Sequence, residues 1–203
     1  DGVVNGDDKV PLSFSSTPRF MYGFGVEFRY KRLSAAVLFK GTGNTDVYHV
    51  GVPASNGALY DEGYIPFYGK QTGNVLSIVK NPANRWISRE YAEKMGLDPS
   101  LSENPNARFP RMSYGNLENN SQTSSFWKNN AKYLRLSEVN INYSVNVPKT
   151  IKNLGINSID LSLVGNNLCV WDKIDICDPE QALYNGRRYP IPASVTLQAY
   201  IKF

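Results

Sequence analysis

This sequence of 203 residues lacks the residues that most catalytic and metal sites need. It has one histidine, His49, and two cysteines, so neither a Ser-His-Asp triad nor a zinc site is expected. The 22 Lys and Arg residues barely outnumber the 18 Asp and Glu residues, and they form no basic block of the kind that binds nucleic acid. We therefore expect a protein that is not an enzyme and does not bind nucleic acid.

Long hydrophobic runs are also missing. No stretch of about 18 apolar residues occurs, which excludes a transmembrane helix. It does not exclude a membrane protein, because a barrel strand crosses the membrane with only about 10 residues of alternating hydrophobicity. Residues 1–5 have neither the basic region nor the apolar core of a signal peptide, so we expect a signal to have been removed or to lie upstream.

Alternation of apolar and polar residues is the strongest pattern that is present. The sequence is rich in Tyr (13) and Phe (9), which favour strands. From position 20 to 30 the even positions are all apolar or aromatic: Phe20, Tyr22, Phe24, Val26, Phe28 and Tyr30. The last residues also alternate, with Val195, Leu197, Ala199 and Ile201 on one side and Thr196, Gln198 and Lys202 on the other.

The alternation predicts an all-β fold with about five antiparallel strands. They are expected at about residues 19–30, 33–42, 133–145, 158–168 and 194–203. Lys31 and Arg32 alone separate the first two, which predicts a tight hairpin. The phase of the third strand changes near Leu134 and Leu136, which predicts a β-bulge.

The connections between these strands differ greatly in length. Residues 1–18, 43–132 and 169–192 form long segments, whereas residues 148–157 form a short turn. Short turns on one side and long loops on the other are typical of outer-membrane barrels. A soluble β-sandwich is the alternative, because its strands also alternate. Charged residues in mid-strand and aromatic residues at strand ends favour the barrel. Within the longest segment, a short helix is expected over residues 88–95.

Several motifs follow one another in a fixed order from residue 125 to the end. They are Ser125-Phe126-Trp127, Lys132-Tyr133-Leu134-Arg135-Leu136, Val139-Asn140-Ile141-Asn142-Tyr143-Ser144, Val164-Gly165-Asn166-Asn167-Leu168, Trp171, Asp178-Pro179-Glu180, Tyr189-Pro190-Ile191-Pro192 and the terminal Phe203. The front adds Asp1-Gly2-Val3-Val4-Asn5, Asp8, Pro18, Tyr22-Gly23-Phe24 and Lys31. Together they resemble the SusC/RagA family of TonB-dependent outer-membrane transporters over nearly the whole chain, apart from about residues 51–122.

The resemblance implies a large transmembrane barrel of about 22 strands, to which this chain would contribute the C-terminal five. The family's plug and TonB-contacting segment are absent from the sequence, so the chain would be a piece or one subunit of a split barrel. The implied function is import of a nutrient, such as an oligosaccharide or peptide, together with a SusD-like surface lipoprotein. A non-transporting surface binding or structural barrel protein is the alternative.

The resemblance also implies where the chain lies and what it contacts. It would be integral to the bacterial outer membrane, with its long segments extracellular and its C-terminus periplasmic. Its partners would be membrane lipid, the remainder of the barrel and plug, and the TonB system acting through that plug.

Asp1, Asn5 and Asp8 have the spacing of the second half of a calcium loop, with Gly2 at the sharp turn. Calcium prefers carboxylate and carbonyl oxygens, which these side chains supply. The first ligands of such a loop would lie upstream of Asp1. An Asx-rich surface turn explains the same residues without a metal.

The segment 169–192 contains two further candidate sites. Four of its residues are acidic: Asp172, Asp175, Asp178 and Glu180. They can bind a metal or transfer protons, but a solvated loop or ion pairs with Arg187 and Arg188 are the simpler interpretation. Cys169 and Cys177 form a disulfide or remain two thiols, and their spacing does not decide between these.

The segment 43–132 is rich in aromatic residues, which include Tyr48, Tyr60, Tyr64, Phe67, Tyr68 and Trp86. Exposed rings of this kind stack on sugars or pack on a partner protein. Packing within the loop itself is the third interpretation, and the sequence does not distinguish the three.

Overall fold

The computed structural model describes residues 2–3, 5–12, 16–49, 75–112, 120, 124–184 and 188–203. The chain divides into two compact units. The first, called the sheet unit, comprises residues 1–47, 129–182 and 188–203; the second, called the loop unit, comprises residues 48–128 and 183–187.

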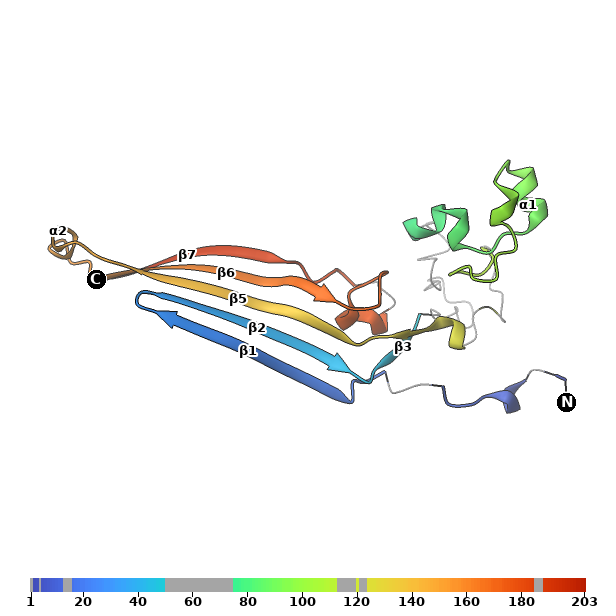
Figure 1. Ribbon diagram of the computed structural model, residues 1–203, viewed down its shortest axis with the longest axis horizontal. Helices are drawn as coiled ribbons and strands as arrows, with labels where there is room; N and C mark the ends of the chain where they lie inside the picture. Colours follow the sequence, from blue (N-terminus) through green and yellow to red (C-terminus); the bar gives the residue numbers. More distant parts are fainter. Residues whose placement is uncertain are drawn as a thin grey trace, which may run out of the picture. The chain divides into compact units, whose positions relative to one another are not determined.

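Five long strands of the sheet unit form one antiparallel sheet in the order β1-β2-β5-β6-β7 (Figure 1). Their bounds are β1 Phe20–Tyr30, β2 Leu33–Gly43, β5 Tyr133–Val145, β6 Ser158–Trp171 and β7 Ser194–Lys202. β6 continues to Trp171, beyond the expected end at residue 168. Lys31 and Arg32 join β1 to β2 in the predicted tight hairpin, and Lys31 has a φ of 54°. The fold is all-β, as the alternation predicts.

The remaining described elements are short. The strands β3 (Asp46–Tyr48) and β4 (Lys128–Asn130) pair with each other. The helices are α1 (Arg89–Lys94), α2 (Lys149–Lys152) and the 3₁₀ helices η1 (Gly6–Asp8), η2 (Ser77–Lys80), η3 (Pro82–Asn84), η4 (Pro99–Leu101), η6 (Ser125–Trp127) and η7 (Pro179–Tyr184). Among the described residues, no helix has the length and apolar character needed to cross a membrane.

Helix α1 forms where the sequence predicts a short helix. The Tyr91 N–H donates to Ser88 Oγ at 3.2 Å, which satisfies a backbone donor at the start of the helix. Beyond its end, Gly96 has a φ of 62°, a conformation that residues with a side chain rarely adopt. The predicted helix is confirmed, with its start and stop at the expected residues.

The strand register gathers the alternating residues onto two faces of the sheet. One row across the five strands consists of Phe28, Ala35, Ile141, Leu163 and Leu197. The neighbouring row consists of Arg29, Ser34, Asn142, Ser162 and Gln198. Because successive side chains of a strand point to opposite sides, these rows lie on opposite faces. We call them the apolar face and the polar face.

A bulge in β5 keeps the apolar face continuous. Leu136 and Glu138 pair with adjacent residues of β2, Phe39 and Leu38, so Ser137 is left out of that register. The register with β6 shifts at the same point. Leu136 and Glu138 are two positions apart and would share a face in a regular strand. The extra residue reverses the alternation, so Leu136 lies on the apolar face and Glu138 on the polar face. The predicted bulge is confirmed.

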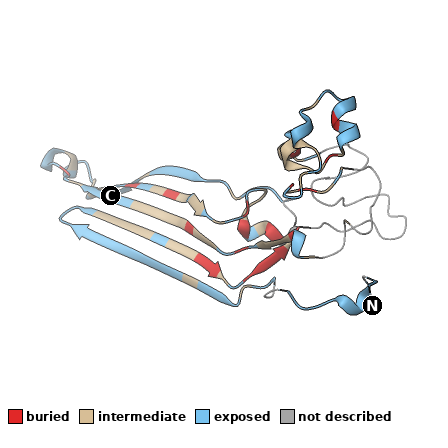
Figure 2. Cartoon of the chain, turned by 45° about the vertical axis from the view of Figure 1, so that its right-hand side comes forward, coloured by how far each residue is buried: buried red, intermediate tan, exposed pale blue. Residues whose placement is uncertain are grey.

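Buried residues gather at the end of the sheet where β2 finishes, whereas most of the strand bodies are half-buried or exposed (Figure 2). A small apolar core at that end contains Val47, Ala131, Ile174 and Ala182. The strands are therefore not packed around an interior of their own, and both faces of the sheet are available for contact with the surroundings.

Candidate functional site

The apolar face of the sheet is exposed along the strands. Val26 on β1 is 73% exposed and Leu197 on β7 is 76% exposed. An apolar surface that continues across five strands is rare on a protein surrounded by water. With a polar opposite face, it is the pattern of the wall of a transmembrane barrel, in which apolar side chains contact lipid.

Aromatic rings cluster on the apolar face near the end of β6. The ring centroids of Phe20 and Tyr22 are 5.5 Å apart, and those of Phe39 and Trp171 are 6.5 Å apart. Phe20 and Trp171 are exposed. Rings with an apolar body and a polar edge favour the boundary between lipid and water, so this cluster is typical of the aromatic girdle of a barrel.

The polar face carries polar contacts on three of its strands. The Ser144 hydroxyl donates to Asp160 Oδ1 at 2.6 Å across β5 and β6. Arg29 and Glu27 on β1 form an ion pair at 2.6 Å, with both side chains exposed. Exposed charges of this kind need water, because removing a charge from water is costly. This face therefore suits a water-filled lumen.

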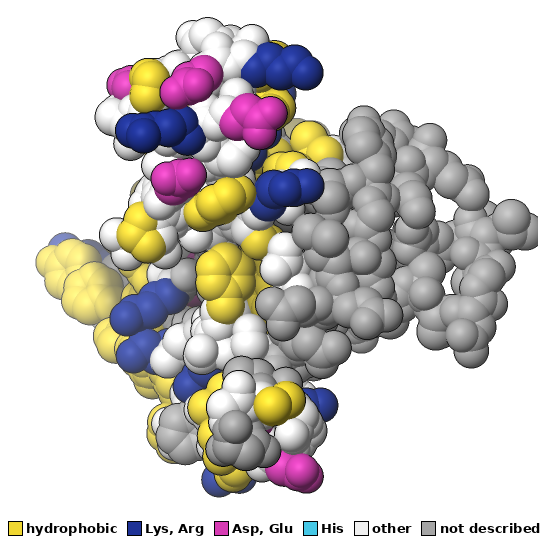
Figure 3. Space-filling model, turned by 90° about the vertical axis from the view of Figure 1, so that its right-hand side faces the viewer, with side chains coloured by type: hydrophobic (Ala, Val, Ile, Leu, Met, Phe, Trp, Pro, Cys, Tyr) yellow, Lys and Arg dark blue, Asp and Glu magenta, His cyan; other side chains and the backbone are white. Residues whose placement is uncertain are grey.

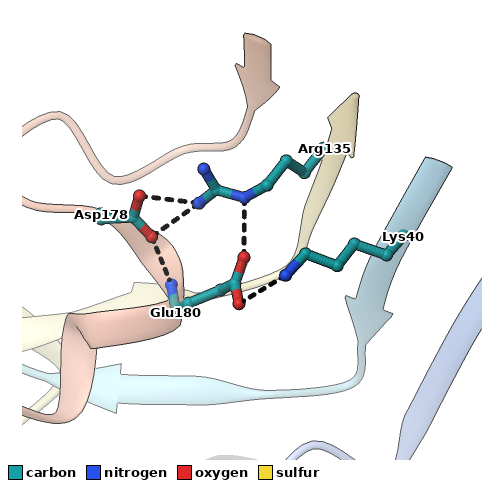
Figure 4. Close-up of polar contacts among 4 residues, drawn as sticks. All are labelled: Lys40, Arg135, Asp178 and Glu180. Carbon is teal, nitrogen blue, oxygen red and sulfur yellow. Dashed lines mark hydrogen bonds and ion pairs between the residues drawn. The ribbon is translucent and has the colours of Figure 1, made fainter. Parts of the chain in front are cut away.

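An ion-pair cluster joins the polar face to the connection after β6 (Figure 4). Arg135 Nη2 lies 2.7 Å from each carboxylate oxygen of Asp178, and Arg135 Nε lies 2.7 Å from Glu180 Oε1. Lys40 Nζ lies 3.0 Å from Glu180 Oε2. Lys40 and Arg135 are register partners on β2 and β5, so two positive charges meet two negative charges at one place.

Burial distinguishes this cluster from an ordinary surface ion pair. The side chain of Arg135 is 2% exposed and that of Asp178 is 9% exposed. A guanidinium group can be buried here because its fork of N–H groups matches carboxylate oxygens. Removing one partner of a buried pair leaves an uncompensated charge and typically costs about 3–5 kcal/mol. The cluster therefore holds the connection against the polar face.

A second contact between strands depends on a glycine. Tyr22 OH donates to the backbone oxygen of Tyr133 at 3.2 Å, and the Tyr22 ring passes Gly41 on the strand between them. A Cβ on Gly41 would come within 2.5 Å of Tyr22 Cζ and would overlap the Tyr133 carbonyl. The position requires glycine because backbone and ring approach so closely.

Asn5 and Asp8 lie in a capped turn, whereas Asp1 lies outside the described residues. The Asp7 N–H donates to Asn5 Oδ1 at 2.7 Å, and the Asn5 N–H donates to Asp8 Oδ2 at 2.8 Å. This is the Asx-rich turn that was the alternative to a calcium half-loop. In the described part of the chain, no three His, Cys, Asp or Glu residues group as metal ligands. The calcium site stays a prediction.

Cys169 and Cys177 are both half-buried, and the structure does not join them in a disulfide. Cys169 pairs with Leu136 on the apolar face of the sheet. Cys177 packs against the small apolar core, beside Ile174. The disulfide stays a prediction.

The acidic segment forms ion pairs, but with partners that the sequence did not single out. Asp178 and Glu180 contact Arg135 and Lys40. Of the two suggested partners, Arg187 lies outside the described residues, and an ion pair of the acidic segment with Arg188 stays a prediction. Lys40 and Arg135 both occur within predicted strands. A positive charge within a sheet is stabilised by a carboxylate nearby, so their positions were a signal that acidic residues contact them. Which carboxylates do so depends on the path of the connection, and local pattern does not give that path.

The aromatic candidates of the long segment are only partly described. Tyr60, Tyr64, Phe67 and Tyr68 lie outside the described residues. Trp86 is half-buried in the loop unit, and its backbone N–H donates to Phe109 O at 2.9 Å. A ligand or partner contact of these residues stays a prediction. His49, the single histidine, is buried in the loop unit.

No family model and no curated protein matches the chain. Solved structures do match. All of the chain aligns with 19% of a chain in the structure of the RagAB peptide transporter, with a TM-score of 0.63 and 17% identity. Structures of the RagAB peptide importer in the open-open and closed-closed states match over the same shares, with TM-scores of 0.58 and 0.60 and identities of 17% and 18%.

The chain thus spans 19% of the length of the transporter chains that it matches. The TM-score and the complete coverage of this chain support a shared architecture. The resemblance expected from the sequence is confirmed at the level of the fold: this chain has the fold of one section of the RagAB transporter chains, a segment of a β-barrel wall.

Proposed function

We propose that residues 1–203 are the C-terminal segment of a SusC/RagA-like TonB-dependent transporter that imports a nutrient across the bacterial outer membrane. The observation that carries the proposal is the five-stranded sheet with one exposed apolar face and one polar face. Such a sheet is stable where one side meets lipid and the other meets water. The similarity to the RagAB chains supports the same assignment.

In this proposal the apolar face contacts lipid and the polar face lines the lumen. β1 and β7 lie at the two edges of the sheet and would pair with other strands of the barrel. An edge without a partner cannot remain in lipid, because its backbone groups have no hydrogen-bonding partners there. The short turns would be periplasmic and the long segments extracellular. The rest of the protein or a partner chain would supply the plug that TonB acts on.

The nutrient is either a peptide or an oligosaccharide. The matched structures are those of a peptide transporter and a peptide importer, which makes a peptide the first candidate to test. The aromatic residues of the long segment suit either class, because rings stack on sugars and also pack on peptide side chains.

A SusD-like surface lipoprotein is the proposed partner outside the membrane. In the end view of Figure 3, acidic, basic and apolar side chains are interspersed among the described residues. Deleting about residues 52–122 should weaken co-purification of this lipoprotein while the barrel remains inserted. Wild-type recovery of the lipoprotein after the deletion would show that this segment is not its docking surface.

Uptake in intact cells tests the proposed function directly. Cells that produce the complete protein are given labelled peptides or labelled oligosaccharides, with and without a functional TonB. We expect uptake of one class, and we expect it to stop when either the barrel or TonB is removed. Cell-surface binding of the ligand is measured in parallel.

The parallel measurement separates transport from the alternative function. A surface binding protein would retain ligand at the cell surface without TonB-dependent entry. Binding that persists in the absence of any uptake would therefore exclude the transporter and favour a non-transporting barrel.

A further inference from the structure

The connection after β6 lies on the polar face although it is not part of the sheet. Residues 172–182, which we call the strap, follow the end of β6 and belong to the sheet unit. Figure 4 shows two carboxylates of the strap, Asp178 and Glu180, directed at Arg135 and Lys40 on two strands. The strap is therefore attached to the wall through side chains as well as through the chain itself.

Two attachments of the strap differ in kind. One is the ion-pair cluster, in which Arg135 is almost fully buried. The other is the small apolar core, where Ile174 and Ala182 of the strap pack with Val47 and Ala131, and the partly buried Ile176 and Cys177 pack against them. Two of the four buried core residues are alanines, which bury little apolar area. The ion pairs are directional and reach two strands, so they fix the position of the strap more strictly than the core does.

We propose that the strap is a releasable lid on the polar face and that Arg135 is its latch. In the closed position, Asp178 and Glu180 neutralise the two basic side chains. Release exposes Arg135 to water, removes the ion-pair partner of the already exposed Lys40, and changes the local charge of the wall from balanced to positive. A carboxylate that has lost its buried partner gains by returning to water, so losing the latch drives the strap open. The inference concerns conformation and does not rest on the proposed function.

The strap contains its own reporter of position. Cys177 is adjacent to Asp178 and packs against the apolar core, so it is half-buried while the strap is closed. Cys169 lies on β6, outside the strap. Replacing Cys169 by Ser therefore leaves Cys177 as the one cysteine of this chain. Any cysteine elsewhere in the complete protein is replaced as well.

The experiment measures how fast a charged, water-soluble maleimide labels Cys177 in the complete, membrane-inserted protein. Arg135→Met should raise the rate by more than about tenfold, because losing one partner of a buried ion pair shifts the equilibrium far toward the open strap. Reaction of the half-buried thiol in the closed strap limits this gain. Arg29→Met is the matched control, because Arg29 forms an exposed ion pair on the same face. It should change the rate by less than about fivefold.

A strand variant can fail to insert, so a second variant changes the strap alone. Asp178→Asn combined with Glu180→Gln should raise labelling like Arg135→Met, and heat-modifiable migration confirms that each barrel is folded. Fast labelling in both cluster variants, with slow labelling in the wild type and in Arg29→Met, supports the latch. Equal rates in all four folded proteins would overturn it. Because no uptake is measured, failure of the latch is distinguishable from failure of the proposed transport.

Discussion

The assignment of the apolar side of β7 to lipid can be tested by placing arginine at two neighbouring positions. Leu197 lies on the apolar face opposite Leu163, whereas Gln198 lies on the polar face opposite Ser162. Leu197 is the fourth of the nine residues from Ser194 to Lys202. At about 3.4 Å per residue it is roughly 10 Å from the start of the strand, well inside an apolar band about 25 Å tall.

The two substitutions should differ strongly in cost. An arginine on the lipid face near mid-membrane costs about 2–4 kcal/mol, so Leu197→Arg should lower the folding equilibrium constant about 30- to 700-fold. Gln198→Arg keeps a polar side chain in water. It loses the exposed hydrogen bond that the Tyr200 hydroxyl donates at 2.9 Å, which contributes about 1 kcal/mol or less.

Folding of the complete barrel into lipid vesicles, titrated with urea, measures both costs under the same conditions. Tryptophan fluorescence follows the transition, and heat-modifiable migration checks that the end state is a barrel. Equal destabilisation by the two arginines would refute the assignment of faces. A larger loss for Gln198→Arg would mean that the faces are reversed.

Three further predictions follow from local geometry. Gly41→Ala should destabilise the folded barrel by about 1–3 kcal/mol in the same titration, because the new Cβ would overlap the Tyr133 carbonyl. Gly23→Ala is its matched control, since the nearest atom to a Cβ there is 3.5 Å away, and an equal loss would contradict this reason. Ser88→Ala should destabilise the start of α1 by about 1 kcal/mol and speed amide hydrogen exchange at Tyr91; unchanged exchange would argue against the cap. Expressed alone, the chain should not give a monodisperse, heat-resistant barrel, because β1 and β7 would have unpaired edges in lipid, and isolation of such a barrel would disprove that the sheet is part of a larger wall.

The strands and their faces could be predicted because the signal is local. Every second side chain of a strand points to the same side. The even positions from 20 to 30 therefore define one face before any partner strand is known. The same rule located the bulge, since the apolar positions change phase between Leu136 and Val139. Helix α1 was predictable for a similar reason, because its cap and its stop are single residues in fixed places.

The cluster around Arg135 could not be predicted, because its partners are distant in sequence. Asp178 is 43 residues away, and its position depends on how the connection folds back over the sheet. The same dependence applies to Cys169 and Cys177, where spacing permits a disulfide and only the fold decides. Alternation shows which side of a strand a residue faces, but it does not show which distant part of the chain contacts that residue.

The bulge at Ser137 gives β5 one residue more than its neighbour β2 needs at that point. Deleting Ser137 would make Leu136 and Glu138 consecutive, and they would pair with the consecutive residues Phe39 and Leu38 in a regular ladder. Arg135 and Leu136 would therefore keep their faces, and Arg135 would still point toward Asp178. The register of β1 with β2 has no such extra residue, so a one-residue deletion within β1 would move every residue on one side of the deletion to the opposite face. The bulge thus makes β5 tolerant of a change in length that β1 would not tolerate.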